Sequence, residues 1–329
     1  MKPVTRRVPA QPLSTESTTA DAPPRAIPNY LAQLDRKTVV LVELDPPKNT
    51  DLPKMLRSAR QLAEAGADAI TLGDSPLAGL RMNGLMIGPT IEQEIDIPVI
   101  CHLACRDRNV IGTQSLLLGA DALGLRSVLA LTGDPAKVGD HPDAVSVYEL
   151  NSFKLVELIN RMNHGQTLAG RSIGRPTAFE IGVAFNPNKR DVMPEVRRLK
   201  RKAERGATFA LTQAVFDADT MRVACEAAHE HVDIPVFAGV FPLLSDRHAE
   251  FLHNEFPGVT VCDDVRHRMA AAAPDKDRMA AEGMAIARDL IDAFRESADG
   301  LYLIPPLNRA AVAVELLHYI HATEPAPQS

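Results

Sequence analysis

The chain has 329 residues, enough for one large domain or two ordinary ones, and 45% of them are hydrophobic, which provides for a sizeable core. Its formal net charge of −6 argues against a nucleic-acid-binding protein. The four cysteines are too few for a disulfide scaffold of this length, so we expect a cytoplasmic protein in a reducing environment. No apolar run reaches the about 20 residues of a membrane span, so no membrane partner is expected.

The first 35 residues have the composition of a flexible extension. They are rich in Pro, Ser, Thr and Ala and lack the apolar stretch of a signal peptide. A transit peptide is the alternative, although Glu16 and Asp21 interrupt its positive character. The sequence therefore predicts one folded unit over residues 36–323, between this extension and a frayed tail at 324–329.

After residue 37, short apolar runs alternate with longer segments of helical period. The eight runs are continuously apolar, as in parallel strands covered on both faces, and they span residues 38–44, 68–74, 98–104, 127–133, 177–186, 208–214, 235–241 and 300–306. The helical segments 52–67 and 196–207 carry Gly66 and Gly206 near their ends, where glycine stops a helix. Between the last two runs we expect an extra helix near 262–272 and a long helix over 276–297.

Eight such units without a break favour a (β/α)8 TIM barrel in a single domain. A doubly wound open sheet is the alternative, but no G-x-G-x-x-G follows the first strand, which argues against a dinucleotide-binding Rossmann domain. In a TIM barrel the chemistry lies at the C-terminal mouth. The strand ends place there Glu43, Asp45, Asp74, His102, Asp134, Asn186, Gln213 and the Leu307-Asn308-Arg309 turn.

Glu43 is the most distinctive of these residues, because it lies inside the first apolar run rather than after it. We therefore expect its carboxyl group to be partly buried. Burial raises the pKa of a carboxyl group and lets it hold a proton near neutrality. Pro46 and Pro47 fix the path of the loop that follows. The alternative is a structural carboxylate that is paired with a nearby arginine.

The turn Thr132-Gly133-Asp134 places a second carboxylate across the barrel, and Gly133 would let the backbone approach a flat ligand closely. An ordinary strand-to-loop turn is the alternative. His102 suits a neutral hydrogen-bond donor to a ligand. No metal site is expected, since Cys101 and Cys105 have no matching Cys/His pair elsewhere in the chain.

A basic helical segment follows the fifth apolar run. Eight basic residues fall between Lys189 and Arg205. Within this segment, four residues lie close to one helix face: Glu195, Arg198, Arg201 and Lys202. This face is either a solvated outer surface or a patch that binds phosphate groups at the barrel rim.

Taken together, these motifs resemble the methylenetetrahydrofolate reductase family. From about Thr38 to Ile320 the chain contains, in order, VELDPP, CHLACRDRN, LALTGDP, VAFNPN, LKRKAERGATFALTQAVFD, FPLLSDRHAEFLHNEFPG and GLYLIPPLNR. The sequences of these motifs are most similar to the reductase half of bifunctional homocysteine methyltransferase–reductase proteins. The ordered set is more specific than any one motif.

The resemblance implies a barrel that binds FAD and reduces 5,10-methylenetetrahydrofolate to 5-methyltetrahydrofolate with NADH or NADPH, in one-carbon metabolism and methionine supply. It implies that Glu43 is the general acid that protonates the folate ring nitrogen, and that Asp134 favours the resulting iminium cation. The implied cofactor contacts are His102, Thr132, Gly133, Asp134, Ala184, Asn186, Glu195, Arg198, Arg201 and Lys202. The implied substrate contacts are Glu43, Gln213, His248, Leu252, Leu307 and Arg309.

The chain differs from the best-studied bacterial members of the family at four of these positions, Thr132, Asn186, His248 and Leu252, and also at Gly73 near the end of the second strand. A flavin-free reductase with direct hydride transfer from nicotinamide therefore stays open as an alternative. A folate-binding methyltransferase or carrier on the same barrel and a non-catalytic partner subunit are further alternatives. The choice among NADH, NADPH and a protein electron donor is open, and so is a homo-oligomer.

Overall fold

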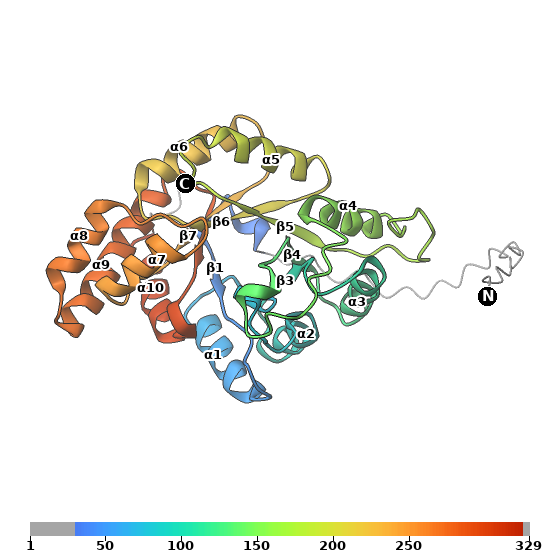
Figure 1. Cartoon of the computed structure of the whole chain (residues 1–329), viewed down its shortest axis with the longest axis horizontal. Helices are drawn as coiled ribbons and strands as arrows, with labels where there is room; N and C mark the ends of the chain where they lie inside the picture. The colour runs from blue at the N-terminus through green and yellow to red at the C-terminus, as the bar shows by residue number, and fades with distance from the viewer. Residues whose placement is uncertain (1–29, 325–329) are drawn as a thin grey trace, which may run out of the picture.

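The computed structural model describes residues 30–324, and this part of the chain forms a closed barrel of parallel strands in sequence order (Figure 1). The predicted TIM barrel is therefore confirmed, and each of the eight predicted runs contains a strand. The strands are β1 (Val39–Glu43), β2 (Ala69–Leu72), β3 (Val99–Ala104), β4 (Ser127–Leu131), β5 (Glu180–Phe185), β6 (Phe209–Ala214), β7 (Val236–Val240) and β8 (Gly300–Leu303).

Helices between the strands form the outer ring of the barrel. They are α1 (Leu52–Glu64), α2 (Gly84–Ile95), α3 (Val110–Ala122), α4 (Ser152–Asn163), α5 (Met193–Ala203), α6 (Ala218–His229), α7 (Asp246–Glu255), α8 (Asp263–Ala272), α9 (Lys276–Phe294) and α10 (Ala310–Ala322). The extra helix and the long helix expected before the last strand are α8 and α9. In Figure 1 they lie together with α7 and α10 on the side opposite α3 and α4. No helix between residues 30 and 324 is long and apolar enough to cross a bilayer.

Local sequence explains where the helices begin and end. Asn109 precedes α3, and its side-chain oxygen accepts a hydrogen bond from the backbone N–H of Gly112 at 2.9 Å. Gly66 and Gly206 follow α1 and α5 with φ of 93° and 108°, a conformation that favours glycine. These glycines end the two helices that the apolar spacing predicted.

The interior of the barrel is an apolar core of its own, separate from the layer between strands and helices. It contains Tyr30, Val39, Leu41, Ala69, Ile100, Leu129, Phe209, Leu211, Phe237 and Tyr302. Because side chains alternate along a strand, Val39, Leu41 and Glu43 share the inward face of β1. The same alternation places His102 on β3 and Gln213 on β6 at the mouth.

The folded unit begins earlier than the sequence predicts. The flexible extension is predicted to reach residue 35, but Tyr30 is only 1% exposed and covers the N-terminal end of the barrel. Its hydroxyl lies 3.0 Å from Oγ of Ser127, and its ring packs edge-on against Phe209 with centroids 6.1 Å apart. The reason is that the aromatic floor of the barrel needs an apolar cover. Residues 1–29 and 325–329 lie outside the described residues, so the rest of the extension and most of the tail stay predictions.

Replacing Tyr30 tests whether this cover belongs to the fold. Tyr30→Ala removes a buried ring and should lower the free energy of unfolding by about 3–5 kcal/mol. Tyr30→Phe removes only the hydrogen bond to Ser127 and should lower it by about 1 kcal/mol. Urea denaturation of the full chain measures both values. Equal stability of Tyr30→Ala and the unmodified chain would show that residue 30 is not part of the packed barrel.

Candidate active site

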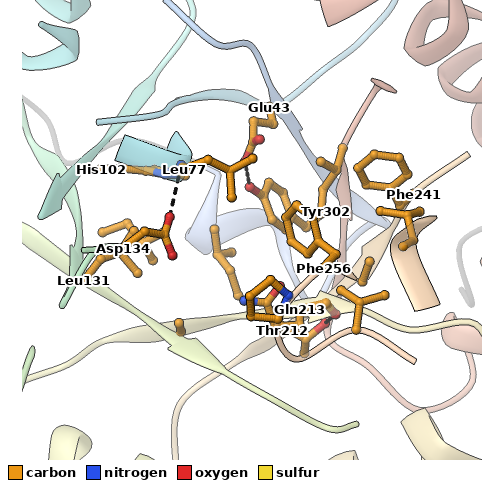
Figure 2. Close-up of a pocket in the computed structure, with 18 residues that line it drawn as sticks. Glu43, Leu77, His102, Leu131, Asp134, Thr212, Gln213, Phe241, Phe256 and Tyr302 are labelled. Carbon is orange, nitrogen blue, oxygen red and sulfur yellow. Dashed lines mark hydrogen bonds between the residues drawn. The ribbon is translucent and has the colours of Figure 1, made fainter. Parts of the chain in front are cut away.

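The mouth of the barrel encloses a cavity of about 220 Å³ (Figure 2). Six of the residues predicted for the site line it: Glu43, His102, Asp134, Ala184, Gln213 and Leu252. The rest of the wall is largely apolar and includes Leu131, Phe241 and Phe256. A few polar groups converging on an apolar cavity are typical of a site that binds and orients a small molecule.

Glu43 and Tyr302 form the central contact of the cavity. Glu43 is partly buried at the end of β1, and its carboxylate accepts a hydrogen bond from the hydroxyl of Tyr302 on the neighbouring strand β8. Burial and, to a smaller extent, the Asp45 carboxylate raise the pKa of Glu43 to about 7, and the Tyr302 hydrogen bond opposes both effects. A carboxyl group that keeps its proton near neutral pH is suited to general acid catalysis.

An arginine partner was the alternative considered for Glu43, but the structure pairs Arg81 with Asp45 instead. Its Oδ2 lies 3.5 Å from Nη2 of Arg81, while burial raises its pKa and Arg81 lowers it. Asn308 accepts a hydrogen bond from the backbone N–H of Asp45 at 2.9 Å and donates one to its carbonyl at 2.8 Å. The loop after β1 is therefore tied to the loop after β8, and Glu43 keeps a neighbouring carboxylate that favours its neutral form.

His102 is a neutral imidazole in the wall of the cavity. It is 8% exposed, and burial lowers its pKa to about 4 although the Asp74 carboxylate opposes the shift. Within residues 30–324 its Nε2 has no hydrogen-bond partner. Asp74 itself is held by both terminal nitrogens of Arg108, at 2.7 and 3.1 Å. A buried ring nitrogen without a protein partner indicates a place for a polar ligand atom.

Asp134 is fixed at both its side chain and its backbone. Its Oδ2 accepts a hydrogen bond from the backbone N–H of Leu77 at 3.0 Å, drawn as a dashed line in Figure 2. Arg106 donates to the Asp134 carbonyl at 3.2 Å, and the Tyr148 hydroxyl donates to the Gly133 carbonyl at 3.0 Å. Gly133 has φ of 83°, so the turn needs glycine for its conformation.

Gln213 occupies an irregular position in the barrel. The register between β6 and β7 shifts between Leu211 and Ala214. The backbone N–H of Gly239 donates at 2.8 Å to the side-chain hydroxyl of Thr212. Irregular strand pairs of this kind redirect side chains near active sites, and here Gln213 lines the cavity.

Several other predicted residues lie around the cavity rather than in its wall. Thr132 and Arg309 are exposed, and Leu307 is 80% exposed with φ of 55°. His248 lies beyond Phe241, with ring centroids 5.5 Å apart, outside the cavity wall. These positions border the mouth and would reach only a ligand that extends out of it.

The predicted basic face of α5 gathers around Phe153, which lies at the start of α4. The guanidinium carbon of Arg201 is 4.7 Å from the ring centroid and that of Arg198 is 5.8 Å away. Lys202 is 8% exposed and donates from Nζ to the carbonyl of Ala184 on β5 at 2.7 Å. Burial lowers the pKa of Lys202 to about 8.

This basic cluster (Arg198, Arg201 and Lys202) carries uncompensated positive charge. Among the described residues, none of its members forms an ion pair with a carboxylate, and Glu195 acts on Lys202 only at longer range. An ammonium group has three donors, and the protein satisfies one of those on Lys202. Asn186, the remaining predicted contact, follows β5 and accepts a hydrogen bond from the backbone N–H of Asn188 at 3.0 Å. The arrangement fits a ligand that carries phosphate groups.

The residues of this region that were not predicted include Leu77, Phe153, Phe241, Phe256 and Tyr302. Tyr302 and Phe241 lie in predicted apolar runs, and a polar hydroxyl in such a run was a usable signal for Tyr302. Leu77, Phe153 and Phe256 reach the site through loops and helix ends, for which the apolar spacing contains no signal.

A family model described as methylenetetrahydrofolate reductase matches residues 29–321. The chain belongs to the methylenetetrahydrofolate reductase family. Its curated relatives include the 5,10-methylenetetrahydrofolate reductase of Buchnera aphidicola subsp. Schizaphis graminum, 26% identical over 226 residues that cover 66% of this chain and 70% of the relative. The Escherichia coli enzyme of the same name is 20% identical over 299 residues, 89% of this chain and 94% of that enzyme.

The match to eukaryotic relatives covers a smaller part of them. Methylenetetrahydrofolate reductase 1 of Schizosaccharomyces pombe is 27% identical over 159 residues, which are 46% of this chain and 24% of that protein. Among solved structures, a Clostridium thermocellum protein described as binding two copies of 5-methyl-5,6,7,8-tetrahydrofolic acid has a TM-score of 0.60. It is 12% identical and covers 89% of this chain and 99% of its own, so this likeness shows the shared fold. The predicted family is thus confirmed.

Two substitutions at the central contact should move the pKa of Glu43 in opposite directions. Tyr302→Phe removes the hydrogen bond that stabilises the carboxylate, so the pKa of Glu43 should rise above about 7. Asp45→Asn removes the neighbouring negative charge, so the pKa should fall. Infrared pH titration of the protonated carboxyl band, assigned by its loss in Glu43→Gln, measures both shifts. Shifts of the same sign would contradict this account of the site.

Proposed function

We propose that this chain reduces 5,10-methylenetetrahydrofolate to 5-methyltetrahydrofolate with NADH or NADPH, through bound FAD. The observation that carries the proposal is the partly buried Glu43, whose pKa of about 7 leaves a proton available in a cavity shared with Asp134 and Gln213. Membership of the reductase family supports the same reaction. The Clostridium thermocellum protein of the same fold, described as binding 5-methyltetrahydrofolic acid, supports folate as the ligand.

The residues present fit FAD. The Nε2 of His102, which has no partner among the described residues, and the turn at Gly133 and Asp134 would border a flat ring system, and the basic cluster would bind the pyrophosphate. Thr132, Ala184, Asn186 and Glu195 would complete the cofactor contacts, as the resemblance implies. Bound FAD would supply the hydride that nicotinamide first provides.

Glu43 is the proton donor in this proposal. Protonated near neutral pH, it gives its proton to a folate ring nitrogen, and the five-membered ring that holds the methylene group opens to an iminium cation. The Tyr302 hydroxyl then donates its hydrogen bond to the carboxylate that is left behind. The negative charges of Glu43 and Asp134 favour the cation in a largely apolar cavity. Gln213 would hold the polar edge of the folate ring.

The loop Ser75–Leu80 must move for the ligands to enter. The cavity of about 220 Å³ is smaller than the about 300–1,000 Å³ of most small-molecule and cofactor sites. Leu77 lines this cavity, and its backbone N–H donates a hydrogen bond to the Asp134 carboxylate. Ser75, Leu77 and Ala78 adopt positive φ of 50°, 52° and 53°, which is unfavourable for residues with a side chain. Release of this loop would free Asp134 for the substrate.

Anaerobic spectroscopy of the purified chain tests the proposed reaction. Flavin absorbance should be present, should be lost on addition of NADH or NADPH, and should return on addition of methylenetetrahydrofolate. Folate-dependent oxidation of nicotinamide without flavin would instead support the flavin-free alternative. A chain that binds folate but oxidises no nicotinamide in its presence would be a carrier, and the proposal would be wrong.

Glu43→Gln should separate the two half-reactions. The amide keeps the size of the side chain but loses the acidic proton, so folate reduction should slow by about 10²–10⁴-fold. Flavin reduction by nicotinamide needs no proton from this group and should change by less than about tenfold. Anaerobic stopped-flow measurements give both rates. Equal slowing of the two half-reactions would make Glu43 a structural or flavin-binding residue.

Replacing Arg201 and Lys202 together with Ala should weaken retention of FAD. The double variant removes two positive charges from the basic cluster beside Phe153. The matched control is Arg197→Ala with Lys200→Ala, which removes two exposed charges from the same helix outside the cluster. Flavin occupancy after dialysis, determined from absorbance, should fall in the first variant and stay unchanged in the second. Full occupancy in both would contradict the assignment of the phosphate site.

A further inference from the structure

Phe256 is an aromatic ring of the cavity wall without a role in the steps above. It lies directly after α7, at the start of the link to α8. Figure 2 places Phe256 with Phe241 on one side of the cavity, whereas His102 and Asp134 lie on the other. Phe256 therefore lies across the cavity from His102 and Asp134, two of the groups assigned to the flavin.

The other two rings of the wall are already engaged. The hydroxyl of Tyr302 is bonded to Glu43, and the ring of Phe241 packs against His248 at 5.5 Å with an interplanar angle of 58°. In the part of the chain that the structure describes, Phe256 forms no ring–ring contact. It is half-buried and so presents an unpaired aromatic face at the cavity.

The backbone that holds this ring is anchored from the loop that follows β5. We call Phe256–Val259 the cap segment; Phe256, Pro257 and Val259 line the cavity. The side-chain amide of Asn188 donates to the carbonyls of Gly258 at 3.0 Å and Ala214 at 2.8 Å. Gly258 has φ of 81° and packs so closely that an added Cβ would lie 2.7 Å from Nδ2 of Asn186. The cap segment is thus fixed across the mouth by two asparagines.

We propose that Phe256 is the stacking surface for the flat bicyclic ring of the folate and determines the affinity for it. An aromatic face at Phe256 and an amide at Gln213 together suit a ligand with a flat apolar face and a polar edge. Leu252, the substrate contact implied by family position, is aliphatic and cannot stack. Phe256 follows it by one helical turn and brings an aromatic ring to the same wall. This inference rests on the proposed function.

The chain contains no tryptophan, which allows a direct optical test. Phe256→Trp places a single indole in the cap segment, and Phe251→Trp places one on α7 at a residue that is 51% exposed. With 5-methyltetrahydrofolate as the probe, emission of the first variant should be quenched to saturation. Emission of the second variant should change only by the amount that light absorption by the added folate accounts for. Unchanged emission of Phe256→Trp at folate concentrations that calorimetry shows to be saturating would overturn the proposal.

Calorimetric titration of a series of variants measures how much Phe256 contributes to folate affinity. Phe256→Leu keeps an apolar side chain but loses the aromatic face, so the Kd for 5-methyltetrahydrofolate should increase by about tenfold or more. Phe256→Tyr should bind within about twofold of the unmodified chain, and Phe251→Leu should bind equally well. Flavin absorbance and thermal unfolding report whether each variant is intact.

The experiments distinguish failure of the role of Phe256 from failure of the proposed function. If the unmodified chain binds folate and Phe256→Leu binds it equally well, the role of Phe256 is wrong and the proposed function stands. If the unmodified chain neither binds 5-methyltetrahydrofolate nor oxidises nicotinamide with methylenetetrahydrofolate, both are wrong. Should Phe256→Leu fail to fold, the quenching of Phe256→Trp decides the question.

Discussion

The hydrogen bond between Tyr302 and the Glu43 carboxylate is the contact around which the mouth of the barrel is organised. A carboxylate removed from water is unfavourable, so burial at the end of β1 favours the protonated form of Glu43. The Tyr302 hydroxyl limits this effect, because it stabilises the charged form. The balance leaves a carboxyl group that holds a proton near neutral pH and is stabilised once the proton is given away.

In the proposed function the barrel separates two tasks around this contact. Proton transfer depends on the inward face of the strands, where Glu43 lies next to the apolar interior of the barrel. Anion binding depends on the outer rim, where Lys202 reaches from α5 to a carbonyl of β5 and keeps donors free. Loops close the space between them: Leu77 holds Asp134 on one side, and the cap segment is clamped by Asn188 on the other.

The sequence predicts the fold and the floor of the site better than its walls. Continuous apolar runs mark buried parallel strands, and a polar residue that ends such a run lies at the mouth, which explains Glu43, His102 and Gln213. Such runs are apolar on both faces, however, so they hide which residues point inward. The hydroxyl of Tyr302 was a signal in its run, but the run did not show that this side chain points into the barrel. Phe256 and Leu77 depend on loop paths, and Tyr30 on the need to cover the barrel floor, none of which has a periodic signal.

The central claim is that Glu43 acts as an acid that stays protonated to about pH 7, and the pH dependence of folate reduction tests it most directly. The rate of flavin reoxidation by methylenetetrahydrofolate, measured anaerobically from about pH 6 to 9, should be level in the acidic range. It should fall about tenfold per pH unit above the pKa of Glu43, because the acid must carry its proton. Flavin reduction by nicotinamide should lack this dependence. A folate-reduction rate that is flat, or that rises with pH, would contradict the account.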